Sequence, residues 1–116
     1  MEDLVSLFSD DEEEVSIVLN EDLNLEQTIL TIPAGKSVIL DLADNEITST
    51  GDYGIEVSGE LTLIGGSIIG TKRTIHVING GTLIVNGTDI TSTTVNAINA
   101  SDEGTTVEIN DGNITA

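Results

Sequence analysis

The pattern of apolar and polar residues changes near residue 15. In the first 14 residues, four apolar side chains fit one face of a short helix: Leu4, Val5, Leu7 and Phe8. From Val15 onward, apolar residues tend to alternate with polar ones, and the breaks fall at Gly, Asn and Asp. The pattern therefore predicts an acidic segment, helical or irregular, over residues 1–14 and many short strands over residues 15–116.

An internal repeat organises the predicted strands. The pattern L-x-[LVI]-x4-I, with Val also allowed first, occurs four times, and its starts are 21, 22 and 24 residues apart. Alignment of the four copies predicts three inward columns: Leu40, Leu61, Leu83 and Val107; Leu42, Leu63, Val85 and Ile109; Ile47, Ile68, Ile90 and Ile114. A second apolar pair recurs as Ile55 with Val57 and as Ile75 with Val77, and residues 15–35 form a less regular first turn.

Two architectures have such a period. A leucine-rich array needs the L-x-x-L-x-L-x-x-N signature and a helical or 3₁₀ half, and the sequence contains neither. A parallel β-solenoid needs only strands and turns, with each coil stacked about 4.8 Å from the last. The repeat therefore predicts an all-β solenoid of about five short coils.

The segments "TIPAGKSVILDLADNEITST", "IEVSGELTLIGGSIIGT" and "IHVINGGTLIVNGTDITST" resemble the right-handed parallel β-helix of the pectate-lyase-like superfamily. That superfamily includes polysaccharide lyases and hydrolases, bacterial surface proteins, and virus appendages such as tailspikes and head fibres. The resemblance implies the fold and leaves these activities open. For a polysaccharide-cleaving member, the resemblance implies that activity would rest on acidic clusters, on calcium with a basic residue in a lyase, or on paired aspartates near a histidine in a hydrolase.

Composition narrows the possible partners. The 116 residues include 21 acidic and 3 basic ones, which gives a formal net charge of −18. Such a charge repels phosphates and anionic headgroups, so we expect neither nucleic-acid nor membrane binding. Hydrophobic residues make up 38% of the chain, which predicts a folded domain despite the charge. Because there is no cysteine, disulfides, thiolate metal sites and cysteine nucleophiles are excluded.

Few residues suggest reaction chemistry. His76 and Arg73 are the only His and Arg, and a 20-residue step would place His76 beside Glu56 and Lys72 beside Asp52. A Glu–His pair could act as orienter and base, but a solvated ladder of ion pairs is the commoner arrangement. Glycosidase chemistry needs two carboxyls roughly 5 to 9 Å apart across a cleft, and the candidates by type are Asp41, Asp44, Glu46, Asp89, Glu108 and Asp111. Because no long loops are present to wall a cleft, we expect no enzyme activity, no cofactor and no metal site.

These observations favour a structural or decoration protein of a virion: a head fibre, a capsid decoration or a spike attachment domain. No basic start and no long apolar run follow Met1, so we expect synthesis in the host cytoplasm and assembly there. Residues 1–14 would serve as a cap or anchor that contacts a partner through Leu4, Val5, Leu7 and Phe8. The open ends of a solenoid favour association, and the resemblance implies a homotrimer attached to a larger assembly such as a capsid. The alternative is a fragment of a secreted or cell-surface β-helix that binds or cleaves carbohydrate and has lost its signal peptide.

Overall fold

A computed structural model describes residues 14–94, 96–101 and 103–115. Throughout this part of the chain the secondary structure consists of short strands joined by turns, with no helix. The predicted helical contact residues lie outside the described residues: Leu4, Val5, Leu7 and Phe8. The structure therefore bears on the predicted solenoid and leaves the predicted cap as a prediction.

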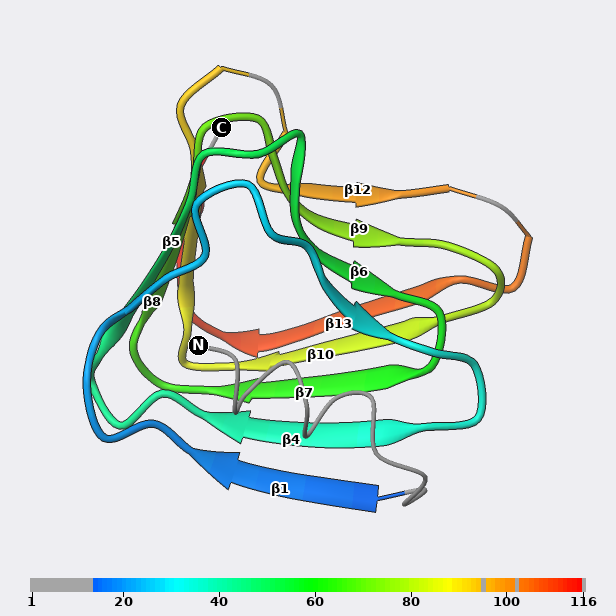
Figure 1. The fold of residues 1–116 in the computed structure, drawn as a ribbon. Helices are drawn as coiled ribbons and strands as arrows, with labels where there is room; N and C mark the ends of the chain where they lie inside the picture. The colour runs from blue at the N-terminus through cyan, green and yellow to red at the C-terminus, as the bar shows by residue number, and fades with distance from the viewer. Residues whose placement is uncertain (1–13, 95, 102, 116) are drawn as a thin grey trace.

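The described residues contain fourteen strands in three parallel sheets, which make the three sides of a tube (Figure 1). Sheet A contains β1 (Glu14–Val18), β4 (Ser37–Asp41), β7 (Glu60–Ile64), β10 (Thr82–Asn86) and β13 (Thr106–Asp111). Sheet B contains β2 (Leu23–Asn24), β5 (Glu46–Ser49), β8 (Ser67–Gly70), β11 (Asp89–Ser92) and β14 (Ile114–Thr115). Sheet C contains β3 (Leu30–Ile32), β6 (Tyr53–Val57), β9 (Arg73–Val77) and β12 (Ile98–Ala100).

The chain visits the three sheets in turn, so three successive strands make one coil. Four coils are complete, and β13 with β14 begins a fifth. Every strand pairs with the strand three places along the chain, in parallel register. The predicted parallel β-solenoid is confirmed.

The inward side chains stack into apolar columns along the axis. In sheet B, the predicted column is confirmed and gains Leu23 at its start: Leu23, Ile47, Ile68, Ile90 and Ile114. In sheet C, one column contains Leu30, Ile55, Ile75 and Ile98. The inward residues of the middle coils are fully buried, and burying each such side chain is worth roughly 1.5–3 kcal/mol. The core is therefore one continuous stack of aliphatic side chains.

The predicted register of β4 in sheet A is wrong by two residues. Val38, and not Leu40, pairs with Leu61, and Leu40 pairs with Leu63. A shift of two residues keeps every side chain on the same face, so the predicted inward residues are inward, but in different columns. Leu42 follows the strand and is fully buried at the corner between sheets A and B.

A longer turn in the second coil explains the shift. Ala43 and Asp44 have φ values of 49° and 66°, and the Asn45 N–H donates a hydrogen bond to the Leu42 carbonyl at 2.8 Å. Four residues, 42–45, separate β4 from β5, whereas only Gly65 and Gly66 separate β7 from β8 in the next coil. The two extra residues account for the shift of β4 relative to β7. A Cβ on Gly66 would clash with the Leu42 side chain, so glycine at this position makes room for Leu42.

The apolar columns remain open on the last coil. Leu83, Val85 and Ile90 are fully buried in the fourth coil, whereas Ile109 is 47% and Ile114 37% exposed. The difference arises because no described strand pairs with the free edges of β13 and β14. These two residues present an apolar surface on which a further coil could stack.

Candidate functional site

The outer face of sheet C gathers three side chains that each occur once in the protein. The chain has one Tyr, one His and one Arg, and all three lie on β6 and β9 as Tyr53, His76 and Arg73. Together with Glu56 and Ser101 they form what we call the sheet C cluster. In a protein with 21 acidic residues, this face also has two of the three basic residues, since Lys72 precedes Arg73.

A local break in alternation brings these residues together. Strict alternation places residues three apart on opposite faces of a strand. In β6, however, Gly54 and Ile55 are both buried, so Tyr53 and Glu56 share the outer face. Thr74 and Ile75 of β9 repeat the pattern, which places Arg73 and His76 on the same face beside them.

Gly54 and Thr74 make this break possible. A Cβ on Gly54 would lie 2.6 Å from the Thr74 carbonyl oxygen, closer than real side chains approach, so only glycine fits there. The Thr74 hydroxyl is fully buried and donates a hydrogen bond to the Thr91 carbonyl at 2.8 Å, which satisfies this polar group inside the solenoid. The site therefore depends on tight packing between adjacent coils.

The aromatic and cationic groups of the cluster contact one another. The Tyr53 and His76 rings are stacked, with centroids 4.6 Å apart and planes inclined by 20°. The guanidinium carbon of Arg73 lies 5.5 Å from the Tyr53 ring centroid, within the range of a cation–π interaction. Tyr53 thus contacts both an imidazole and a guanidinium on an otherwise acidic protein.

His76 lies between a carboxylate and a hydroxyl. Its Nδ1 is 3.7 Å from Glu56 Oε2, and its Nε2 is 3.4 Å from Ser101 Oγ. The predicted neighbours Glu56 and His76 are confirmed as strand partners. Ser101 was not predicted, although it lies one coil further along the chain and directly after β12. Nδ1 is buried and has no hydrogen-bond partner among the described residues.

Glu56, His76 and Ser101 follow one another in the order of a proton relay. A carboxylate, an imidazole and a hydroxyl in this order form the relay of many acyl-transfer sites, but proton transfer needs heavy-atom distances of about 2.6–3.2 Å. Both His76 distances exceed that range. In this structure His76 is therefore not at proton-transfer distance from Glu56 or Ser101.

An exposed ion pair adjoins the cluster. The Lys72 ammonium is 2.9 Å from Asp52 Oδ1, as predicted from the 20-residue step. The hydrogen bond from Lys72, its charge and, to a smaller degree, the charge of Arg73 lower the pKa of Asp52 below its ordinary value. Both side chains are more than half exposed, so solvent screens the pair and its effect on stability is small.

A hollow lies beside the ion pair. It has a volume of about 420 Å³, and Tyr53 lines it together with Asp52, Lys72, Gln27 and Ile29. This volume is near the lower end of the range for ligand pockets. A ligand in this hollow would lie next to Tyr53 and to the Asp52–Lys72 ion pair.

The other carboxylates named by the sequence do not gather into a site. Asp41, Glu108 and Asp111 lie on sheet A, Glu46 and Asp89 on sheet B, and Asp44 in the turn after β4. Within residues 14–94, 96–101 and 103–115, no three His, Asp or Glu side chains are grouped so that they could hold a metal ion. No helix in this part of the chain is long and apolar enough to span a membrane.

The fold defines the class of protein as a parallel β-solenoid. No family model, curated protein or solved structure matches the chain.

Proposed function

We propose that this chain is a non-enzymatic β-solenoid of a virion, of the head-fibre, capsid-decoration or spike-attachment kind, and that the sheet C cluster contacts its target. The observation that carries the proposal is the gathering of the only Tyr, His and Arg on one outer face, where their side chains contact one another. Tyr and Arg are the residues that most often dominate binding energy at protein surfaces.

The architecture supports a structural role. A solenoid presents rigid, flat faces because each coil is hydrogen-bonded to the next and the core is continuous. Virus appendages of the pectate-lyase-like superfamily use such rods, and membership of that superfamily is part of the proposal. The chain would be made in the host cytoplasm and assembled there into particles.

The open last coil supports association. Ile109 and Ile114 continue columns whose preceding members are fully buried, so a subunit stacked on them would extend the apolar core. We expect a homo-oligomer, with a trimer as the first choice, attached to a larger assembly such as a capsid. Multi-angle light scattering of the full-length protein tests this, since a monodisperse monomer at all concentrations would contradict it.

Particle composition tests the proposed role directly. Mass spectrometry and immunogold labelling of particles purified from the source should find the protein as a regular component of the particle surface. Particles with the double substitution Tyr53→Ala and Arg73→Gln should assemble normally and attach poorly, whereas Ile69→Ser on the outer face of sheet B should change neither property. Detection of the protein only in free cytosol or in the cell wall would overturn the proposal.

A secreted or cell-surface β-helix that binds or cleaves carbohydrate is the second candidate. The hollow beside Tyr53 favours it, because an aromatic face next to charged hydrogen-bonding groups is well suited to a sugar ring. A glycan array separates the two candidates when it is combined with localisation. Specific binding that Tyr53→Ala abolishes, in a protein found on the cell surface, would favour this reading over the virion.

A further inference from the structure

The outer face of sheet A combines exposed apolar side chains with carboxylates. Val18, Ile39 and Ile64 are 58%, 44% and 36% exposed, and they are three of the six large apolar side chains that are exposed in the described part of the chain. Ile84 is half-buried on the same face. We call this surface, defined by Val18, Ile39, Ile64 and Ile84, the sheet A stripe.

The strand register places the stripe residues next to one another. Ile39 and Ile84 both pair with Thr62 of β7, from opposite sides, so the three side chains form one row along the axis. Adjacent strands are about 4.8 Å apart, which makes this row roughly 10 Å long. Ile64 lies in the next row, since its partners are Asp41 and Asn86.

Carboxylates lie beside the stripe and within it. Glu14 and Glu60 share the row on one side with Ser37. Asp41 lies between Val18 and Ile64 in their own row, which ends at Asp111, and Glu108 follows Ile84. No Lys, Arg or His occupies an outward position on the five described strands of sheet A. The outward side chains of these strands therefore offer apolar contacts and negative charge.

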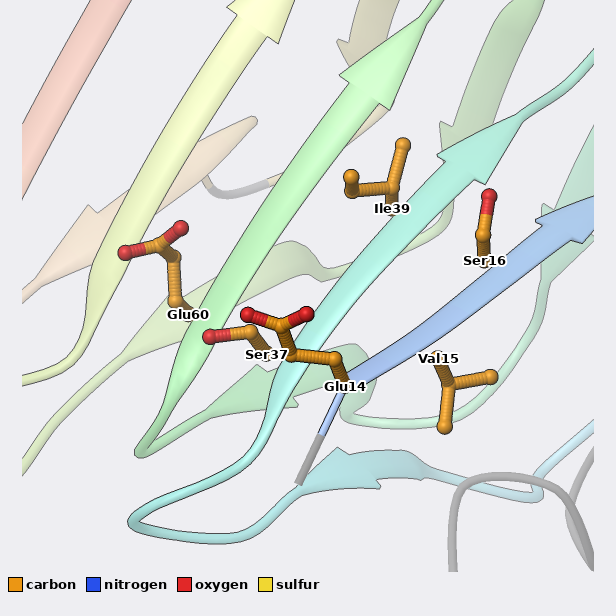
Figure 2. Close-up of a pocket in the computed structure, with 6 residues that line it drawn as sticks. All are labelled: Glu14, Val15, Ser16, Ser37, Ile39 and Glu60. Atoms are coloured by element: carbon orange, nitrogen blue, oxygen red, sulfur yellow. The ribbon is translucent and has the colours of Figure 1, made fainter. Parts of the chain in front are cut away.

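A hollow at the β1–β4 edge adds shape to this face. It has a volume of about 310 Å³ and is lined by Glu14, Val15, Ser16, Ser37, Ile39 and Glu60. Figure 2 shows the Glu14 and Glu60 carboxylates standing on either side of the Ser37 hydroxyl, with Ile39 further along the strand. A long aliphatic side chain that ends in a cation would fit here, because its stem would contact Ile39 while its charge lay near the carboxylates.

We propose that the sheet A stripe binds a segment of another protein in which apolar side chains are flanked by Lys or Arg. Its apolar residues would cover Ile39, Ile64 and Ile84, and its cations would pair with the carboxylates beside and between them. A second copy of this chain is a poor occupant of this face, because it would bring a net charge of −18 against the carboxylates of sheet A.

Selection from a library of short random peptides, displayed on phage and panned on the full-length protein at about 0.15 M salt, tests the proposal. The enriched peptides should combine apolar residues with Lys or Arg. Their synthetic versions should bind Ile39→Ser/Ile64→Ser and Glu14→Gln/Glu60→Gln at least about tenfold more weakly than the wild type. All four side chains are exposed, so these variants should fold, which thermal unfolding checks.

Matched controls separate a specific site from general attraction. Ile69→Ser/Ile29→Ser replaces two solvent-accessible isoleucines elsewhere, and Glu46→Gln/Glu103→Gln removes the same charge outside sheet A. Both control variants should bind the peptides as the wild type does, and so should Tyr53→Ala, because the sheet C cluster lies on another face. The proposal is overturned if no peptide is enriched, if the enriched peptides lack cations, if the charge control weakens binding equally, or if Ile39→Ser/Ile64→Ser dissociates a homo-oligomer.

Discussion

Leu40 of β4 is the strand partner of Leu63 of β7, and both side chains are fully buried in a column that continues to Val85. Each member of the column contacts the one before and the one after it along the axis. The middle coils consequently have no solvent-exposed edge through which the core could relax after a substitution. Stability should therefore be most sensitive to substitutions in the second, third and fourth coils.

Leu63→Ala should be strongly destabilising. The substitution leaves a cavity between Leu40 and Val85, and comparable truncations of buried leucines cost about 2–5 kcal/mol. Urea unfolding followed by circular dichroism measures the change. The same experiment on Ile39→Ala, which is 44% exposed on the same sheet, should show a much smaller loss. Equal losses for the two variants would contradict the observed register.

Ala43→Gly should stabilise the protein. Ala43 has a φ of 49°, and this left-handed conformation costs a residue with a Cβ roughly 1–2 kcal/mol relative to glycine. Part of this gain is lost to the greater freedom of glycine in the unfolded chain, so the net increase in the free energy of unfolding should be a few tenths to about 1 kcal/mol. Ala34→Gly is the matched control, because Ala34 has no positive φ and should gain nothing.

Lys72→Gln should raise the pKa of Asp52 toward its ordinary value, because the hydrogen bond and the charge of Lys72 are the main causes of its lowered pKa. Since the pKa is lowered in the folded state, the small stabilisation from this pair is present above the unfolded pKa of Asp and is lost as the pH falls through the folded value. Carbon-13 NMR titration of the Asp52 carboxyl measures the shift. Arg73→Gln should have a smaller effect, and the reverse order would contradict the geometry of the pair.

Gly54→Ala should disturb the sheet C cluster. The added Cβ would lie 2.6 Å from the Thr74 carbonyl oxygen, so β6 would have to move away from β9 and separate the Tyr53 and His76 rings. The near-ultraviolet circular dichroism of tyrosine reports this directly, because Tyr53 is the only tyrosine and the chain has no tryptophan. Gly35→Ala, which has open space around its Cβ, should leave the signal unchanged even if stability falls.

Moderate salt should raise the thermal midpoint. The net charge of −18 causes repulsion among the carboxylates, and the screening length shortens from about 30 Å at 0.01 M to about 8 Å at 0.15 M ionic strength. Differential scanning fluorimetry across this range should show a rising midpoint. A neutral osmolyte at matched osmolality serves as the control for preferential exclusion. An unchanged midpoint would show that charge repulsion is not significant for stability.

Much of the fold follows from short-range regularities in the sequence. The repeat and the alternation of apolar residues predict a parallel solenoid because only stacked coils bury such short strands. The column Ile47, Ile68, Ile90 and Ile114 could be predicted because the repeat places each member at the same distance after an inward apolar residue: Leu42, Leu63, Val85 and Ile109. The pairs Glu56–His76 and Asp52–Lys72 were also predictable, because both follow from one repeat step of 20 residues.

Only the tertiary structure decided the register of β4 and the composition of the sheet C cluster. The run from Val38 to Leu42 alternates so regularly that two registers bury it equally well, and the left-handed turn at Ala43 and Asp44 selects one of them. Tyr53 joins Glu56 on the outer face because Gly54 fits against the Thr74 carbonyl of the next coil. The sequence determined which residues repeat and which are apolar. Contacts between coils decided which side chains are neighbours across the strands, because close packing depends on turn length and on the space left by single glycines.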